Sequence, residues 1–167
     1  SYMRFDELIP ASSVPTKTLR ERTVIQGVGA PMVARWKFSE ERKLEDPFMT
    51  RNGYLAAVTA TLDFERPKSN LCKVRLRLHD PSVEQNVRIG GASRALAADY
   101  SAPTEWLLTH DVDDMAKLDA LLNPKKHLDR VGLLSLEPDA PGRVPLIFVH
   151  GLASKPATWK NVYNELQ

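Results

Sequence analysis

The residues that could do chemistry lie close together near the end of the sequence, at His150, Gly151 and Ser154. An apolar run, residues 144–149, precedes them, and apolar side chains at helical spacing follow them, namely Trp159, Val162, Tyr163 and Leu166. A strand that feeds a helix through a His-Gly corner exposes backbone N–H groups beside a helix N-terminus. Such N–H groups can stabilise the negative charge that develops on an oxygen atom during acyl transfer.

Two elements must position this corner. Residues 144–149 predict a short buried strand, and residues 156–166 predict a helix with one apolar face. Pro156 suits the first turn of a helix, where a missing N–H costs little, and Ser154 is placed to cap exposed donors. An ordinary strand-turn-helix connection without any chemistry is the alternative interpretation.

The order of apolar strand, His-Gly-Leu, Ser and Thr-Trp in residues 131–167 resembles the α/β-hydrolase superfamily, in particular bacterial lipase-like or esterase-like members with a long N-terminal leader. The resemblance implies that the N–H of Leu152 is one donor of an oxyanion hole. It also implies that His150 and Gly151 form and brace the turn, while Ser154 and Trp159 cap and pack the helix. The implied substrate is an acylglycerol or another lipid-like acyl ester, and no cofactor is expected.

The catalytic triad of that family is absent from this chain. In the family, the elbow G-x-S-x-G, the acid and the histidine follow the His-Gly strand. Ser93 imitates an elbow in Gly-Ala-Ser-Arg-Ala, but it precedes His150 by 57 residues and is rejected as the nucleophile. We therefore expect either the remainder of the hydrolase domain, as a second chain or a further segment, or an oligomeric contact that covers Ile147 and Val149. A non-catalytic binding or interaction module is the competing function.

Composition narrows the class of protein. The 167 residues are 43% hydrophobic and carry a net charge of +2, which is ordinary for a globular chain and does not indicate a nucleic-acid partner. No run of about 18 apolar residues predicts a membrane span. The single cysteine, Cys72, excludes an internal disulfide, and no cluster has the spacing of a metal site. The compartment stays open, with a bacterial extracytoplasmic or secreted protein as one interpretation.

The expected fold class is α/β. We expect residues 1–130 to form a mainly antiparallel β-rich leader domain with short helices, and residues 131–167 to begin an α/β-hydrolase sheet. Residues 54–65 alternate with period two, which predicts a strand with an inward face made by Tyr54, Ala56, Val58, Ala60, Leu62 and Phe64. Residues 72–79 alternate likewise, and the two stretches predict an antiparallel hairpin.

Three other patterns have a structural and a functional interpretation. The row Lys73, Arg75, Arg77 and His79 fits a solvated strand face better than a site for lipid or nucleic-acid phosphates. Gly27 and Gly29 form a G-x-G, but Pro31 follows where a dinucleotide fingerprint would continue, so a bent strand is expected. His110 near three aspartates is expected to end a helix over residues 101–110 rather than bind a cation, and a second helix is predicted over residues 115–122.

Overall fold

The computed structural model describes residues 5–64, 72–110, 133–138, 144–151 and 156–167. The strands in this part of the chain are β1 (Glu7–Pro10), β2 (Val24–Ile25), β3 (Ala30–Trp36), β4 (Tyr54–Phe64), β5 (Val74–His79), β6 (Asn86–Ile89), β7 (Ala92–Ala95) and β8 (Ala98–Asp99). The helices are α1 (Glu40–Glu45), α2 (Ser101–His110) and α4 (Lys160–Glu165), with 3₁₀ turns η1 (Ala11–Ser13) and η3 (Pro156–Trp159).

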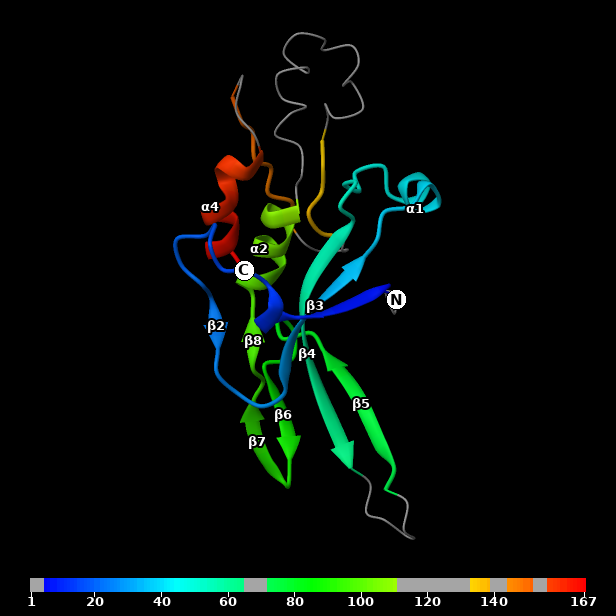
Figure 1. Cartoon of the computed structure of the whole chain (residues 1–167), viewed down its shortest axis with the longest axis vertical. Coiled ribbons are helices and arrows are strands. Elements are labelled where there is room, and N and C mark those ends of the chain that lie inside the picture. The colour runs from blue at the N-terminus through cyan, green and yellow to red at the C-terminus, as the bar shows by residue number, and fades with distance from the viewer. Residues whose placement is uncertain (1–4, 65–71, 111–132, 139–143, 152–155) are drawn as a thin grey trace.

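A four-stranded sheet in the order β1-β3-β4-β5 forms the centre of the molecule (Figure 1). Every neighbouring pair in it is antiparallel, and β3 pairs with β4 from Ala30 opposite Ala60 to Trp36 opposite Tyr54. Two small antiparallel ladders, β2-β8 and β6-β7, lie beside the main sheet. The pair Asn52-Gly53, a residue combination typical of turns, connects the segment after β3 to β4.

One face of the sheet is covered by α2 and η1, and this is where the hydrophobic core lies. The core consists of Ala11, Val14, Val33, Leu55, Ala102 and Trp106. The guanidinium of Arg35 lies 4.4 Å from the centre of the Trp106 ring and covers its face. The predicted helix over residues 101–110 is confirmed, but Ser101 does not cap it. Asp99 accepts the N–H of Ala102 at 3.0 Å, while the Ser101 hydroxyl accepts the N–H of Thr23 at 2.7 Å.

The expected α/β architecture is wrong, because the chain forms a mainly antiparallel β-sheet with few helices. Within the described residues, 144–151 belong to no strand, and 133–138 contribute only a bridge between Ser135 and Met49. Parallel strands need long crossover connections, usually helices, between them. Here β3, β4 and β5 follow one another along the chain, and each successive pair is antiparallel. The expected domain boundary near residue 130 lies outside the described residues.

The antiparallel pairing of β4 with β5 is confirmed, but its buried face was predicted wrongly. Thr59 and Thr61 are buried, at 0% and 8% exposure, whereas Leu62 and Phe64 are 55% and 67% exposed. The Thr59 hydroxyl donates to the carbonyl of Ala97 at 2.6 Å, which satisfies its polar group in the interior. Because α2 packs on the face that holds Leu55 and Thr59, the predicted inward face is buried only at Tyr54 and is open at its far end, at Leu62 and Phe64.

The predicted helix after the His-Gly corner is confirmed as η3 followed by α4. Its apolar face was predicted only in part: Trp159 and Tyr163 are half-buried, but Val162 and Leu166 are exposed and Asn164 is buried. Asn164 Nδ2 donates to the carbonyl of Glu21 at 3.2 Å, and the Tyr163 hydroxyl donates to Glu137 at 3.1 Å. Polar contacts therefore hold α4 against the part of the chain formed by β1–β8 and α2, which we call the β-rich body. The predicted helix over residues 115–122 and the aspartates after His110 lie outside the described residues.

Candidate functional site

The His-Gly segment lies on the surface of the molecule. The apolar side chains of Val144, Leu146, Ile147 and Val149 are 64–92% exposed, and His150 and Gly151 are exposed as well. Among the described residues, the His150 ring has one hydrogen-bond partner, the carbonyl of the neighbouring Gly151, at 3.3 Å. A Cβ added to Gly151 would meet no described atom within 4 Å. The corner is thus open to an incoming molecule or chain.

Trp159, a predicted site residue, packs against the aromatic ring of Phe148. Its ring lies 5.7 Å from the ring of Phe148, centre to centre, so η3 folds back toward the apolar segment. The indole N–H of Trp159 is buried and has no hydrogen-bond partner among the described residues. Leu152 and Ser154, the predicted oxyanion donor and helix cap, lie outside the described residues. The structure therefore places Trp159 beside the His-Gly segment and leaves the geometry of the Leu152 amide a prediction.

A hydroxyl, an imidazole and a carboxylate line up at the base of the β4–β5 hairpin. The Thr61 hydroxyl lies 2.8 Å from Nε2 of His79, and Nδ1 of His79 lies 2.6 Å from a carboxylate oxygen of Glu84. This is the order of nucleophile, base and acid in hydrolytic triads. Thr61 and His79 are buried, however, so a substrate cannot approach the hydroxyl. The trio instead fixes the turn after β5 to the sheet.

Sequence reasoning missed this trio because it placed His79 on the outward face with the basic row. The register of the β4–β5 hairpin shows why these side chains meet. Thr59 pairs with His79 in the ladder, so Thr61 lies diagonally across from the imidazole on the same face. Glu84 comes directly after the turn that follows β5, and this turn brings its carboxylate back to His79.

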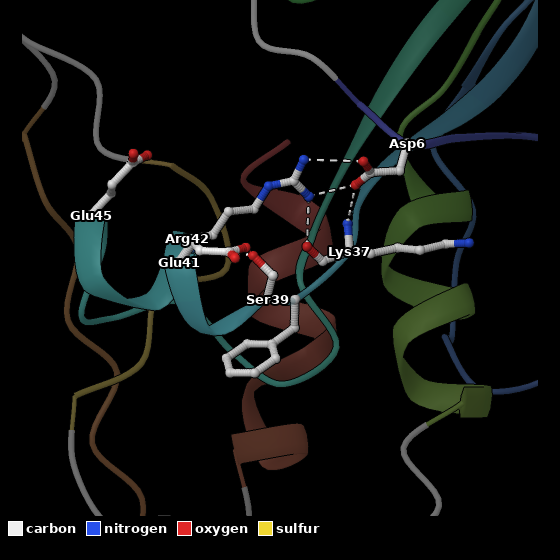
Figure 2. Close-up of a pocket in the computed structure, with 7 residues that line it drawn as sticks. Asp6, Lys37, Ser39, Glu41, Arg42 and Glu45 are labelled. Carbon is white, nitrogen blue, oxygen red and sulfur yellow. Dashed lines mark hydrogen bonds and ion pairs between the residues drawn. The ribbon is translucent and has the colours of Figure 1, made fainter.

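A depression of about 490 Å³ lies between β1 and α1 (Figure 2). Its charged walls are paired with each other: Arg42 Nη2 donates to Asp6 at 3.1 Å, and the N–H of Lys37 donates to the same carboxylate at 2.7 Å. Hydrogen bonds from Arg42 and Lys37 lower the pKa of Asp6 to about 2. Ser39 accepts the N–H of Arg42 and caps α1. These side chains satisfy one another and serve to hold α1 against the sheet.

A second depression, of about 190 Å³, is lined by Glu105 of α2. Glu105 is 2% exposed, and its carboxylate accepts the N–H groups of Thr18, at 3.0 Å, and Leu19, at 2.8 Å. Burial alone would raise the pKa of Glu105, but the hydrogen bonds from Thr18, Leu19 and Lys17 outweigh it and lower the pKa. The carboxylate is therefore a charged anchor for the loop over residues 17–19.

In the described ranges, no group of three or more His, Cys, Asp or Glu side chains is arranged to hold a metal ion. None of the helices described here combines the length and the apolar character needed to cross a membrane. Comparison of the chain with protein-family models, with curated proteins and with solved structures finds no match.

Proposed function

We propose that this chain is the N-terminal part of a serine ester hydrolase and that it supplies one oxyanion-hole amide, that of Leu152, to a catalytic part that carries the nucleophile. One observation carries the proposal. The apolar side chains between Val144 and Val149 are largely exposed, and they lead directly into His150 and Gly151. A segment of this composition is suited to being covered by a further part of the protein.

The energetics of burial favour such a covering. Burying one Val, Leu or Ile side chain stabilises a fold or a complex by about 1.5–3 kcal/mol. Four such side chains are exposed within six residues here, at Val144, Leu146, Ile147 and Val149. Contiguous apolar surface of this kind marks interaction sites in folded proteins.

The β-rich body holds the chain on both sides of the His-Gly segment. Before the segment, the N–H of Ser135 donates to the carbonyl of Phe48 at 2.8 Å. After it, α4 is attached through Asn164 to Glu21 and through Asn161 to the N–H of Arg20, each at 3.2 Å. Two anchors of this kind support a carrier role, in which the body presents the corner to the catalytic part.

The proposed chemistry follows from the resemblance to lipase-like and esterase-like hydrolases. A serine on the catalytic part attacks the carbonyl carbon of an acylglycerol or similar acyl ester, and the carbonyl oxygen becomes an oxyanion. The N–H of Leu152 and a second N–H after the serine would donate to that oxygen. His150 would brace the turn and take no part in proton transfer, because the triad histidine comes last in the chain order of these enzymes.

A pair of substitutions at one position tests the proposal in a protein that contains this chain together with the catalytic serine. Leu152→Pro removes the backbone N–H, whereas Leu152→Ala keeps it. We expect Leu152→Pro to lower kcat for an acyl ester by about 100-fold to 1,000-fold, the usual effect of losing one oxyanion donor. Leu152→Ala should stay within a few-fold of the parent. Equal kcat values for the two folded variants would contradict the proposal.

A non-catalytic interaction module is the second candidate, and the core favours it. Val33, Leu55 and Trp106 pack together without any contribution from residues 144–151, so the β-rich body has a core of its own. A serine-directed fluorophosphonate probe separates the two functions. Labelling of the complete assembly that disappears when its elbow serine is replaced supports the hydrolase. A folded, complete assembly that does not label supports the module.

A further inference from the structure

The outer part of the β4–β5 hairpin projects away from α2 and the core (Figure 1). Four apolar side chains share one of its faces, because Leu62 pairs with Leu76 and Phe64 pairs with Val74. We call these four residues the apolar tip. Their side chains are 47–67% exposed, although a two-stranded ribbon has little stability of its own in water. An apolar surface against this face would remove that exposure.

The neighbouring strands are rich in arginine. Together β5, β6 and β7 carry Arg75, Arg77, Arg88 and Arg94 and contain no Asp or Glu. The β6–β7 hairpin points toward the same end of the molecule as the apolar tip (Figure 1), and it adds the exposed Ile89. On β4, Asp63 lies opposite Arg75 in the ladder and forms an ion pair with Arg77. The exposed Arg88 and Arg94 are therefore the positive charges that accompany the exposed apolar side chains at this end of the molecule.

We propose that this end of the molecule docks on the surface of an anionic phospholipid bilayer, with the apolar tip inserted among the acyl chains and Arg88 and Arg94 beside the lipid phosphates. Apolar insertion and attraction to anionic lipid act together in this mode of binding. Arg88 and Arg94 lie at exposed positions of the β6–β7 ladder. Their long side chains can reach the headgroups while the apolar face points inward.

A second copy of the chain on the same face is a separate outcome of the experiment, because Arg75 and Arg77 lie on the opposite face of the ribbon and do not exclude it. Composition speaks against a nucleic acid. A single-stranded nucleic acid would require aromatic side chains for its bases to stack on, and Phe64 is the sole aromatic residue of the apolar tip. The lipid proposal does not depend on the hydrolase proposal, because it concerns a different end of the chain and a different measurement.

Co-sedimentation with vesicles tests the proposal. Vesicles of phosphatidylcholine alone are compared with vesicles in which about one-third of the lipid is phosphatidylglycerol, at low and at high ionic strength. We expect binding to the anionic vesicles at low ionic strength and at least tenfold weaker binding to the neutral ones. High ionic strength should also weaken binding severalfold. Equal binding to both kinds of vesicle, or no binding to either, would overturn the proposal.

Two variants and two matched controls locate the contact. Phe64→Ser combined with Leu76→Ser, and Arg88→Gln combined with Arg94→Gln, should each weaken vesicle binding about tenfold or more. The control for the apolar variant is Leu44→Ser, which alters a residue of α1 that is 84% exposed. The control for the charge variant is Lys17→Gln with Arg20→Gln, which removes two positive charges elsewhere. Both controls should bind vesicles within about twofold of the parent. Binding that is unchanged by the first two variants refutes the proposed surface.

A probe on Cys72 provides a readout that needs no substitution at the tip. Cys72 is the chain's only cysteine, is exposed, and lies just before β5. An environment-sensitive fluorophore attached to it should shift to the blue with anionic vesicles and not with neutral ones. An unchanged emission spectrum in the presence of sedimenting vesicles would count against insertion. Light scattering could instead detect a dimer that is lost in the variant Phe64→Ser with Leu76→Ser, while no vesicle binding is seen. That result would refute the lipid proposal and identify a second copy of the chain as the occupant of this face.

Discussion

At the scale of single residues, buried polar groups decide how the loops attach to the sheet. Glu105 is the clearest case, because a carboxylate that is 2% exposed is tolerated only when donors surround it. The donors are backbone N–H groups of residues that precede it by more than 80 positions in sequence, Thr18 and Leu19. Glu105 therefore closes a long stretch of chain against α2.

We expect Glu105→Ala to lower the free energy of unfolding by about 3 kcal/mol, because it leaves buried N–H groups without an acceptor. Glu41→Ala, at an exposed position of α1, should change it by less than about 0.5 kcal/mol. Denaturant unfolding of the two variants provides the measurement. Equal stabilities would show that water replaces the carboxylate without penalty.

Glu105 should also shape the pH dependence of stability. Its pKa is lowered in the folded chain relative to the ordinary value of 4.5, so the unfolded chain binds more protons over the interval between the two values. The contribution is present above pH 4.5 and is lost as the pH falls through the folded pKa. Glu105→Gln should flatten this part of the stability profile, measured by unfolding at a series of pH values. A profile parallel to that of the parent would refute the assignment.

At the scale of elements, the connection into β4 depends on a glycine. Gly53 has φ of +80°, and a Cβ at this position would lie 1.8 Å from the carbonyl oxygen of Trp36. The dipeptide Asn52-Gly53 was recognisable from sequence as a turn, because glycine accepts positive φ at no steric cost. The close approach of the Trp36 carbonyl was not, since it depends on how β3 and β4 are paired.

Gly53→Ala and Gly90→Ala separate these two effects. Both glycines have positive φ, but a Cβ at Gly90 meets nothing within 4 Å. We expect Gly90→Ala to destabilise the fold by about 1 kcal/mol, the cost of the left-handed conformation. Gly53→Ala should destabilise it by about 3 kcal/mol or more, because the backbone must also move. Thermal unfolding gives the comparison, and equal losses would mean that the turn relaxes freely.

At the scale of the whole molecule, a core covered by α2 coexists with two exposed apolar surfaces, the apolar tip and the segment 144–149. The apolar tip lies at the outer end of the β4–β5 hairpin. Segment 144–149 precedes η3 and α4 in the sequence and is exposed on the surface. Such surfaces carry a tendency to associate. The state of assembly is therefore the property that the proposed hydrolase role constrains most directly.

We expect the purified chain to be found with a partner or as an oligomer through Ile147 and Val149. Ile147→Asp combined with Val149→Asp should shift the mass in solution toward the monomer, whereas Val83→Asp, at another exposed valine, should not. Light scattering coupled to size exclusion measures the mass. A monodisperse parent chain of 18.7 kDa with cooperative unfolding would speak against the proposed covering of this segment.

The sequence by itself determined the local structure. Alternation of apolar and polar residues predicted β4 and β5, the pair Asn52-Gly53 predicted the turn before β4, and the run from Ser101 to His110 predicted α2. These features depend on neighbours within a few positions, and the periods of 2 and 3.6 residues make them visible. For the same reason, the exposed corner at His150 could be marked as a candidate from its residue types alone.

Only the tertiary structure decided which face of a strand is buried and which strands are neighbours. Thr59 and Thr61 look like surface residues in a list of hydropathies, yet they are buried because Ala97 and His79 provide hydrogen-bond partners and α2 packs on their side. The order β1-β3-β4-β5 likewise rests on contacts between residues far apart in sequence, which no local pattern encodes. Burial is a property of what packs against a face, and that is settled only when the whole chain has folded.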